Sequence, residues 1–190
     1  MRYELTNVLL TIGHSNRTLE AFLHLLVAHG VTGLVDVRTI PQSRYNPQFN
    51  RETLPDALAK AGIRYAHMAG LGGRRQPRPD SHNAGWRHPS FRGYADYMQT
   101  PQFEEHLATL LQMAQVDRIA VMCAEAVPWR CHRSLIADAA VVRGVPVDHI
   151  MSPTVRSKHT LTPFARVEGA GLTYPGLFEE PGAARRRGHL

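Results

Sequence analysis

The densest group of reactive side chains lies between residues 123 and 134. In chain order it contains Cys123, Glu125, Arg130, Cys131, His132 and Arg133. An apolar run precedes the group and a helical pattern follows it, so the segment joins a strand to a helix. The free backbone N–H groups of a helix start attract anions, and arginines there add positive charge. The segment therefore predicts an anion site at which Arg130 and Arg133 contact phosphate.

The two cysteines of this segment leave three interpretations open. A cysteine at such a junction has a lowered thiol pKa and becomes nucleophilic, as in phosphatase and rhodanese loops, although Arg130 comes one position later than the arginine of those loops. Thiolate and imidazole groups also suit zinc or iron, which makes Cys123, Cys131 and His132 an alternative metal site. The structural interpretation is that Cys123 packs as a small apolar residue while His132 caps the helix.

A second polar group follows the short apolar run at residues 34–38. Asp36 and Arg38 alternate with apolar neighbours, so they share one face of the strand and can pair. Arg38, Ser43 and Arg44 make a cationic loop with a hydroxyl group, which suits phosphate. The structural alternative is an ion pair that closes a long loop.

Two further segments add a histidine and a basic turn. Residues 13–15, which include His14 and Ser15, end the first apolar run, and His14 could equally be a hydrogen-bonded buried histidine. Residues 70–89 are rich in glycine, proline and arginine and have no periodicity, which is typical of a lid over a ligand or of a solvated excursion.

The elements that must position these residues alternate between strand and helix. We expect strands at residues 8–12, 34–38, 63–68, 119–123 and 145–150, and helices at 18–30, 53–61, 94–98, 101–115 and 134–143. This alternation predicts a three-layer α/β domain with a mainly parallel sheet of about five strands flanked by helices. The domain is expected to span residues 1–151, followed by an extended or partly ordered basic tail at 152–190.

Ligands of an open parallel sheet bind beyond the carboxyl ends of its strands. The reactive groups follow the expected strands at that edge, so we predict one cleft lined by His14, Asp36, Arg38, Glu125 and His132.

Five short segments resemble the family called domain of unknown function 488. They are residues 11–15, 36–43, 71–73, 94–98 and 123–133, in the expected order within residues 9–150. The resemblance implies one constellation made of His14, Asp36, Arg38, Ser43, Glu125, Cys131, His132 and Arg133, without assigning roles. Some members are described in connection with DNA repair, and the resemblance extends that expectation to this chain.

The leading hypothesis is an enzyme, a hydrolase or transferase, that acts on a nucleotide, a nucleic acid or another phosphate-bearing molecule by general acid–base chemistry. Glu125 or Asp36 is the expected base and His14 or His132 the acid. The groups expected to bind the substrate or its phosphate are Ser15, Arg38, Ser43, Arg44, Arg130 and Arg133. No cofactor is expected, with zinc or iron at the cysteines as the alternative.

A non-catalytic nucleic-acid-binding module is the second hypothesis. The formal net charge of +6 favours a polyanionic partner, although residues 185–187 alone supply half of it. Trp86, Tyr94 and Tyr97 are the candidates for stacking on bases.

The composition and the first residues of the chain indicate its cellular compartment. Its 43% hydrophobic and 20% charged residues are ordinary for a globular protein. No apolar run approaches the roughly 20 residues that cross a bilayer, and residues 1–15 lack a signal-peptide pattern. We therefore expect a cytoplasmic protein with no membrane partner and with both cysteines reduced.

Overall fold

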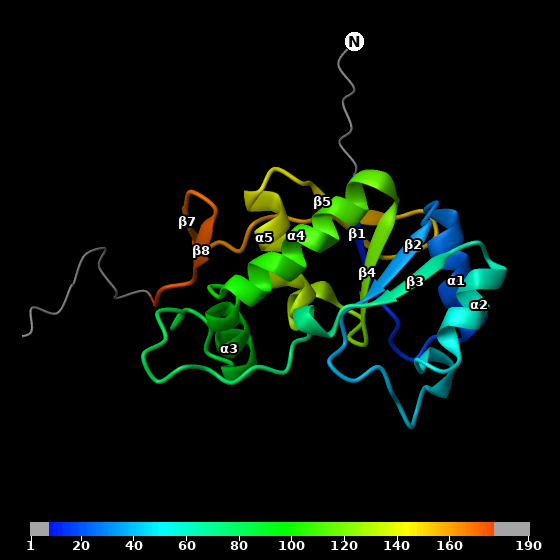
Figure 1. The fold of residues 1–190 in the computed structure, drawn as a ribbon, viewed down its shortest axis with the longest axis horizontal. Coiled ribbons are helices and arrows are strands. Elements are labelled where there is room, and N and C mark those ends of the chain that lie inside the picture. The colour runs from blue at the N-terminus through cyan, green and yellow to red at the C-terminus, as the bar shows by residue number, and fades with distance from the viewer. Residues whose placement is uncertain (1–7, 177–190) are drawn as a thin grey trace, which may run out of the picture.

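The structure, a computed structural model, describes residues 8–176 and is built around one six-stranded sheet (Figure 1). The strands are β1 (Leu9–Gly13), β2 (Gly33–Asp36), β3 (Arg64–His67), β4 (Ile119–Cys123), β5 (Val147–Ile150) and β6 (Arg156–Lys158). They lie in the order β3-β2-β4-β1-β5-β6, and all neighbours are parallel except β5 and β6. The expected three-layer α/β fold is confirmed, with β6 as an additional antiparallel edge strand.

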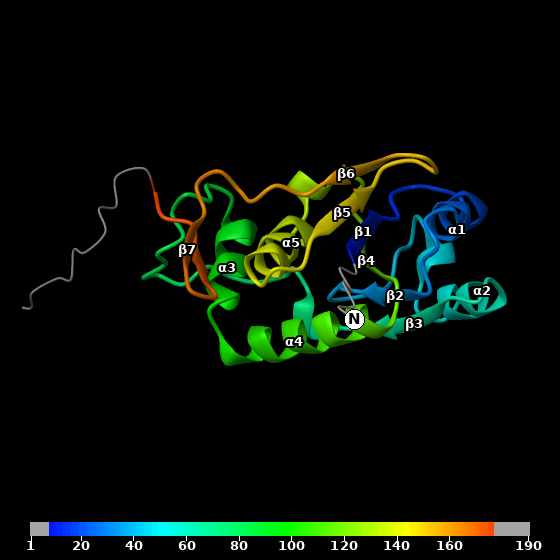
Figure 2. The same cartoon turned by 90° about the horizontal axis from the view of Figure 1, so that it is seen from above.

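Helices cover both faces of the sheet (Figure 2). The elements α1 (Leu19–Ala28) and α2 (Leu54–Lys60) pack on one face, and α3 (Pro89–Tyr97), α4 (Pro101–Val116) and α5 (Arg133–Val142) lie on the other. Successive residues of a strand point to opposite faces, so β4 gives Met122 to the first core and Val121 to the second. Strands buried on both faces explain the apolar runs in the sequence.

Local signals in the sequence set most helix starts. The Thr18 hydroxyl accepts from the Ala21 N–H at the start of α1, and Thr100 does the same for α4. Helix α3 begins at Pro89, five residues before the expected pattern. Proline suits the first helical turn, and His88 Nδ1 accepts from the Ser90 N–H at 3.2 Å. Histidine is not a typical capping residue, so this helix start could not be predicted from residue types.

The order of the strands creates a crevice at the carboxyl ends of β1 and β4. The chain leaves β1 through α1 toward β2 and β3, whereas it leaves β4 through α5 toward β5 on the opposite side. Because β1 and β4 are neighbours, with Gly13 opposite Cys123, their following loops diverge at one point of the sheet edge. Ligand sites of doubly wound sheets form at such switch points.

The described part of the predicted tail packs on the domain. After β6 the chain forms a hairpin of β7 (Arg166–Glu168) and β8 (Gly171–Thr173). The fully buried Tyr174 then donates its hydroxyl to Asp138 of α5 at 2.8 Å. Residues 177–190, with the three consecutive arginines of the tail, lie outside the described residues. None of the helices within 8–176 is both long enough and apolar enough to span a bilayer.

Candidate functional site

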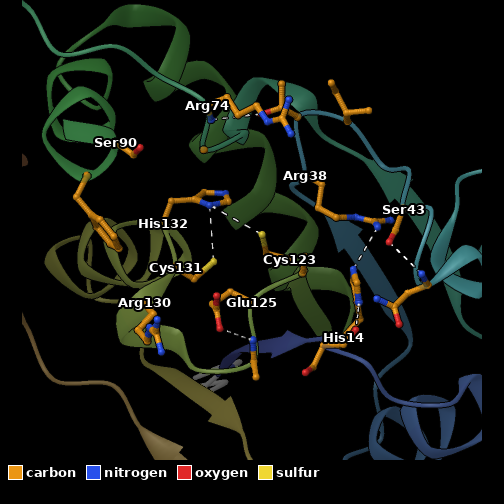
Figure 3. Close-up of a pocket in the computed structure, with 18 of the residues that line it drawn as sticks. His14, Arg38, Ser43, Arg74, Ser90, Cys123, Glu125, Arg130, Cys131 and His132 are labelled. Atoms are coloured by element: carbon orange, nitrogen blue, oxygen red, sulfur yellow. Dashed lines mark hydrogen bonds between the residues drawn. The ribbon is translucent and has the colours of Figure 1, made fainter. Parts of the chain in front are cut away.

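A cavity of about 950 Å³ occupies the crevice at the ends of β1 and β4 (Figure 3). Both cysteines line it, as do seven of the ten residues predicted to be catalytic or anion-binding, namely His14, Ser15, Arg38, Ser43, Glu125, Arg130 and His132. The other three, Asp36, Arg44 and Arg133, are not part of its lining. The predicted cleft thus contains four of its five expected residues, and Asp36 lies outside it.

Asp36 is fully buried at the end of β2, where it holds Arg38. Arg38 donates from Nε to Asp36 Oδ1 at 2.9 Å and from a terminal nitrogen to Oδ2 at 2.6 Å. The Tyr65 hydroxyl donates to the same Oδ2 at 2.9 Å. Burial and the neighbouring carboxylate raise the pKa of Tyr65, so its hydroxyl stays protonated. With both oxygens engaged, Asp36 orients Arg38 and offers no lone pair to the cavity.

His14, at the end of β1, supports the same arginine. Its Nδ1 lies 2.7 Å from the carbonyl oxygen of Ser15, which can only accept, so Nδ1 carries the proton. Its Nε2 therefore accepts from Arg38 at 3.3 Å. Burial lowers the pKa of His14 to about 4, and the positive charge of Arg38 acts in the same direction. A neutral His14 at pH 7 positions Arg38 and has no proton on Nε2 to give.

Arg133, the first residue of α5, shapes the loop that follows β4. Its side chain is only 1% exposed and donates to the Glu125 carbonyl oxygen at 2.5 Å, to Thr11 at 3.2 Å and to Cys131 Sγ at 3.4 Å. This arrangement requires glycine at position 13, because a Cβ there would lie 1.9 Å from that carbonyl oxygen. The Glu125 carboxylate is left exposed at the cavity, with Oε1 accepting from the Ala126 N–H.

The two thiols and the imidazole of His132 form a cluster in one wall of the cavity (Figure 3). His132 Nδ1 lies 4.0 Å from Cys123 Sγ and 3.7 Å from Cys131 Sγ. Both cysteines are free, in agreement with the expected reduced state. A hydrogen bond between the thiols lowers the pKa of Cys131, helped by His132 and Arg133, and together with burial raises the pKa of Cys123.

His132 stands at the start of α5, but its side chain makes no capping hydrogen bond, so the interpretation of this histidine as a helix cap is wrong. The backbone of Gly73 packs on the imidazole instead, since a Cβ at that position would lie 2.4 Å from Nδ1. The glycine-rich turn after β3 therefore contributes to the site by covering His132.

Arginines dominate the charge of the cavity wall. Arg38, Arg74 and Arg130 line it, while Glu125 is the one carboxylate among the described lining residues. No hydrogen bond within residues 8–176 engages the guanidinium group of Arg74 or Arg130, in contrast to Arg38. These two side chains are available to an anionic ligand.

An exposed aromatic residue at the cavity was missed by the sequence reasoning. Trp129 lines the cavity and is 65% exposed. The three aromatic residues predicted to stack on bases pack instead in or against the core formed with α3 to α5. Tyr94 and Tyr97 donate their hydroxyls to backbone carbonyls, and Trp86 stacks on Phe91. The available signal was position, because Trp129 belongs to the reactive loop itself.

Comparison with known proteins assigns the chain to a family. The family model described as "Domain of unknown function DUF488" matches residues 18–140, which is more than half of the chain. The protein therefore belongs to this family, as the five motifs indicated. No curated protein matches the chain, and no solved structure does.

Proposed function

We propose that the protein is an enzyme that binds a phosphate-bearing substrate, a nucleotide or a nucleic acid, in the cavity between β1 and β4 and transforms it by general acid–base chemistry. The observation that supports this most is that two unengaged arginines, Arg74 and Arg130, line the same cavity as a single exposed carboxylate, that of Glu125.

The arginines account for binding of the substrate. Arg74 and Arg130 are free to form charge-assisted bonds to phosphate oxygens. Arg38 lines the same cavity, and its bonds to Asp36 and His14 hold the guanidinium group in place, so it needs no reorganisation when substrate binds. The indole of Trp129 offers an exposed face on which a base can stack.

Glu125 is the proposed general base. Of the two carboxylates predicted as the base, only that of Glu125 lines the cavity. The other, that of Asp36, has both oxygens engaged by Arg38 and Tyr65. A carboxylate beside arginines repels phosphate, so its presence there is better explained by proton transfer than by anion binding. His132 turns Nδ1 toward the sulfur atoms of Cys123 and Cys131, so we assign this nitrogen no role in proton transfer to the substrate.

The proposal is tested by Glu125→Gln. We expect turnover to fall about 100-fold or more, the scale of a lost acid–base group, with binding retained. Turnover and binding should be measured on nucleotides, sugar phosphates and short single- and double-stranded oligonucleotides. Glu105→Gln, an exposed substitution on α4, is the matched control and should leave both quantities unchanged.

The opposite result would favour a binding module. In that case neither the natural protein nor the variant turns over any substrate of the panel, and Glu125→Gln binds oligonucleotides more tightly because a repulsive charge is gone.

A further inference from the structure

We propose that Cys123, Cys131 and His132 form a zinc-binding site with a fourth coordination position that opens into the cavity. The sulfur atoms of the two cysteines and one ring nitrogen of His132 all lie within 4.8 Å of one another. Cys123 is the last residue of β4, and Cys131 and His132 are the two residues that directly precede α5.

The spacing of the three atoms suits tetrahedral zinc. With zinc bonds of about 2.3 Å to sulfur and 2.0–2.1 Å to nitrogen, ligand atoms lie about 3.6–3.8 Å apart. His132 Nδ1 is 3.7 Å from Cys131 Sγ and 4.0 Å from Cys123 Sγ. The two nitrogen–sulfur distances therefore need to shorten by only a few tenths of an ångström to match those of a zinc site.

The surroundings favour bound thiolates. Arg133 donates to Cys131 Sγ at 3.4 Å, and it is itself fixed by the Glu125 carbonyl oxygen. A hydrogen-bond donor behind a metal-bound thiolate orients the ligand and compensates its charge. The backbone of Gly73 closes the other side of the imidazole, so the metal is approached from the cavity.

Three protein ligands and an open fourth position are the pattern of catalytic zinc, whereas structural sites have four. Zinc in this place would lower the pKa of a bound water and would explain the nearby Glu125 as its proton acceptor. This catalytic role rests on the proposed function, but the binding of the metal does not.

The test is a cobalt titration of the purified, metal-free protein in a phosphine reductant, followed by displacement with zinc. We expect about one cobalt per chain, with the visible absorption of a tetrahedral ion and a sulfur-to-metal charge-transfer band. Cys123→Ser, Cys131→Ser and His132→Asn should each weaken affinity about 100-fold or more, beyond the effect of losing an outer-shell partner. His88→Asn, which alters a non-ligand histidine of the same cavity and keeps a capping side chain, should bind as the natural protein does.

Circular dichroism is recorded on each variant, and Cys123→Ser carries the conclusion if the buried Cys131 does not tolerate serine. The proposal is overturned if the natural protein binds cobalt without a charge-transfer band, or no more tightly than Cys123→Ser. The titration contains no substrate. Loss of the proposed enzymatic function would leave its result intact, and failure to bind metal would leave the Glu125→Gln test intact.

Discussion

Asp36 is the residue that decides where Arg38 points. Its carboxylate accepts three bonds from the guanidinium group and one from Tyr65, and neither Asp36 nor Arg38 has more than 6% of its side chain exposed. A buried charge is stable only when it is paired and hydrogen-bonded, so each partner depends on the other.

We expect Asp36→Asn to destabilise the protein by about 3–5 kcal/mol, because the charge of Arg38 remains buried without compensation. Urea unfolding measures this change. The control is Asp80→Asn, which removes an exposed partner of Arg78 and should leave the unfolding curve unchanged. An Asp36→Asn protein as stable as the natural one would mean that this pair contributes nothing to the fold.

Residue types predicted the site better than they predicted individual roles. His14 and Arg38 were expected at the cavity and line it. Arg38, however, donates hydrogen bonds to His14 and to Asp36, so both side chains are largely engaged within the protein. Arg133 was expected to contact phosphate and instead binds the loop backbone from a buried position. Arginine is rarely buried, so nothing in the sequence distinguished the inward Arg133 from the outward Arg130.

The helices and strands whose apolar residues recur at a regular spacing could be predicted from the sequence. The parallel strands and helices α1, α2, α4 and α5 follow apolar patterns that burial imposes directly. The conformation of residues 70–89 could not be predicted, because it is held by contacts with residues of α3 that lie further along the chain. Asp96 of α3 accepts from the Arg78 N–H, Ser81 and Asn83, and Arg75 lies over the ring of Tyr97. Contacts of this kind produce no apolar periodicity in the sequence.

A pair of histidines, one in β5 and one directly after β6, should make the stability of the protein depend on pH. His149 of β5 bonds Thr11 at 2.7 Å and His159 at 3.0 Å, and His159 bonds Asp138 of α5 at 2.8 Å. Burial, with His159 acting in the same direction, lowers the pKa of His149 from 6.5 to about 4. Between pH 6.5 and about 4, His149 is therefore protonated in the unfolded chain but not in the folded chain.

It follows that the free energy of unfolding decreases as pH falls from 6.5 to 4, by about 3 kcal/mol for a shift of this size. His14 contributes in the same direction. Urea unfolding at several pH values between 7 and 4 measures the slope, and His149→Gln should make it shallower. An unchanged slope in this variant would show that His149 is not a source of the acid sensitivity.

The site as a whole is a product of the topology of the sheet. Segments around residues 14, 38, 74 and 130 meet because β1 and β4 are adjacent while their connections run to opposite sides. Strand order cannot be obtained from periodicity, but the rule that ligands bind at carboxyl strand ends was enough to group the residues. The same lack of periodicity hid β6 and the hairpin of β7 and β8, which are short and mostly exposed.

We propose that this cavity binds phosphate through Arg74 and Arg130, whose guanidinium groups make no hydrogen bond within residues 8–176. Calorimetric titration of inorganic pyrophosphate into the natural protein, Arg74→Gln, Arg130→Gln and the double variant tests it most directly. We predict that each single change weakens binding about tenfold or more, the worth of a bond to a charged group. Arg87→Gln, at an exposed arginine outside the cavity lining, should have no effect. Equal affinity of the double variant and the natural protein for pyrophosphate would show that these two arginines do not bind phosphate.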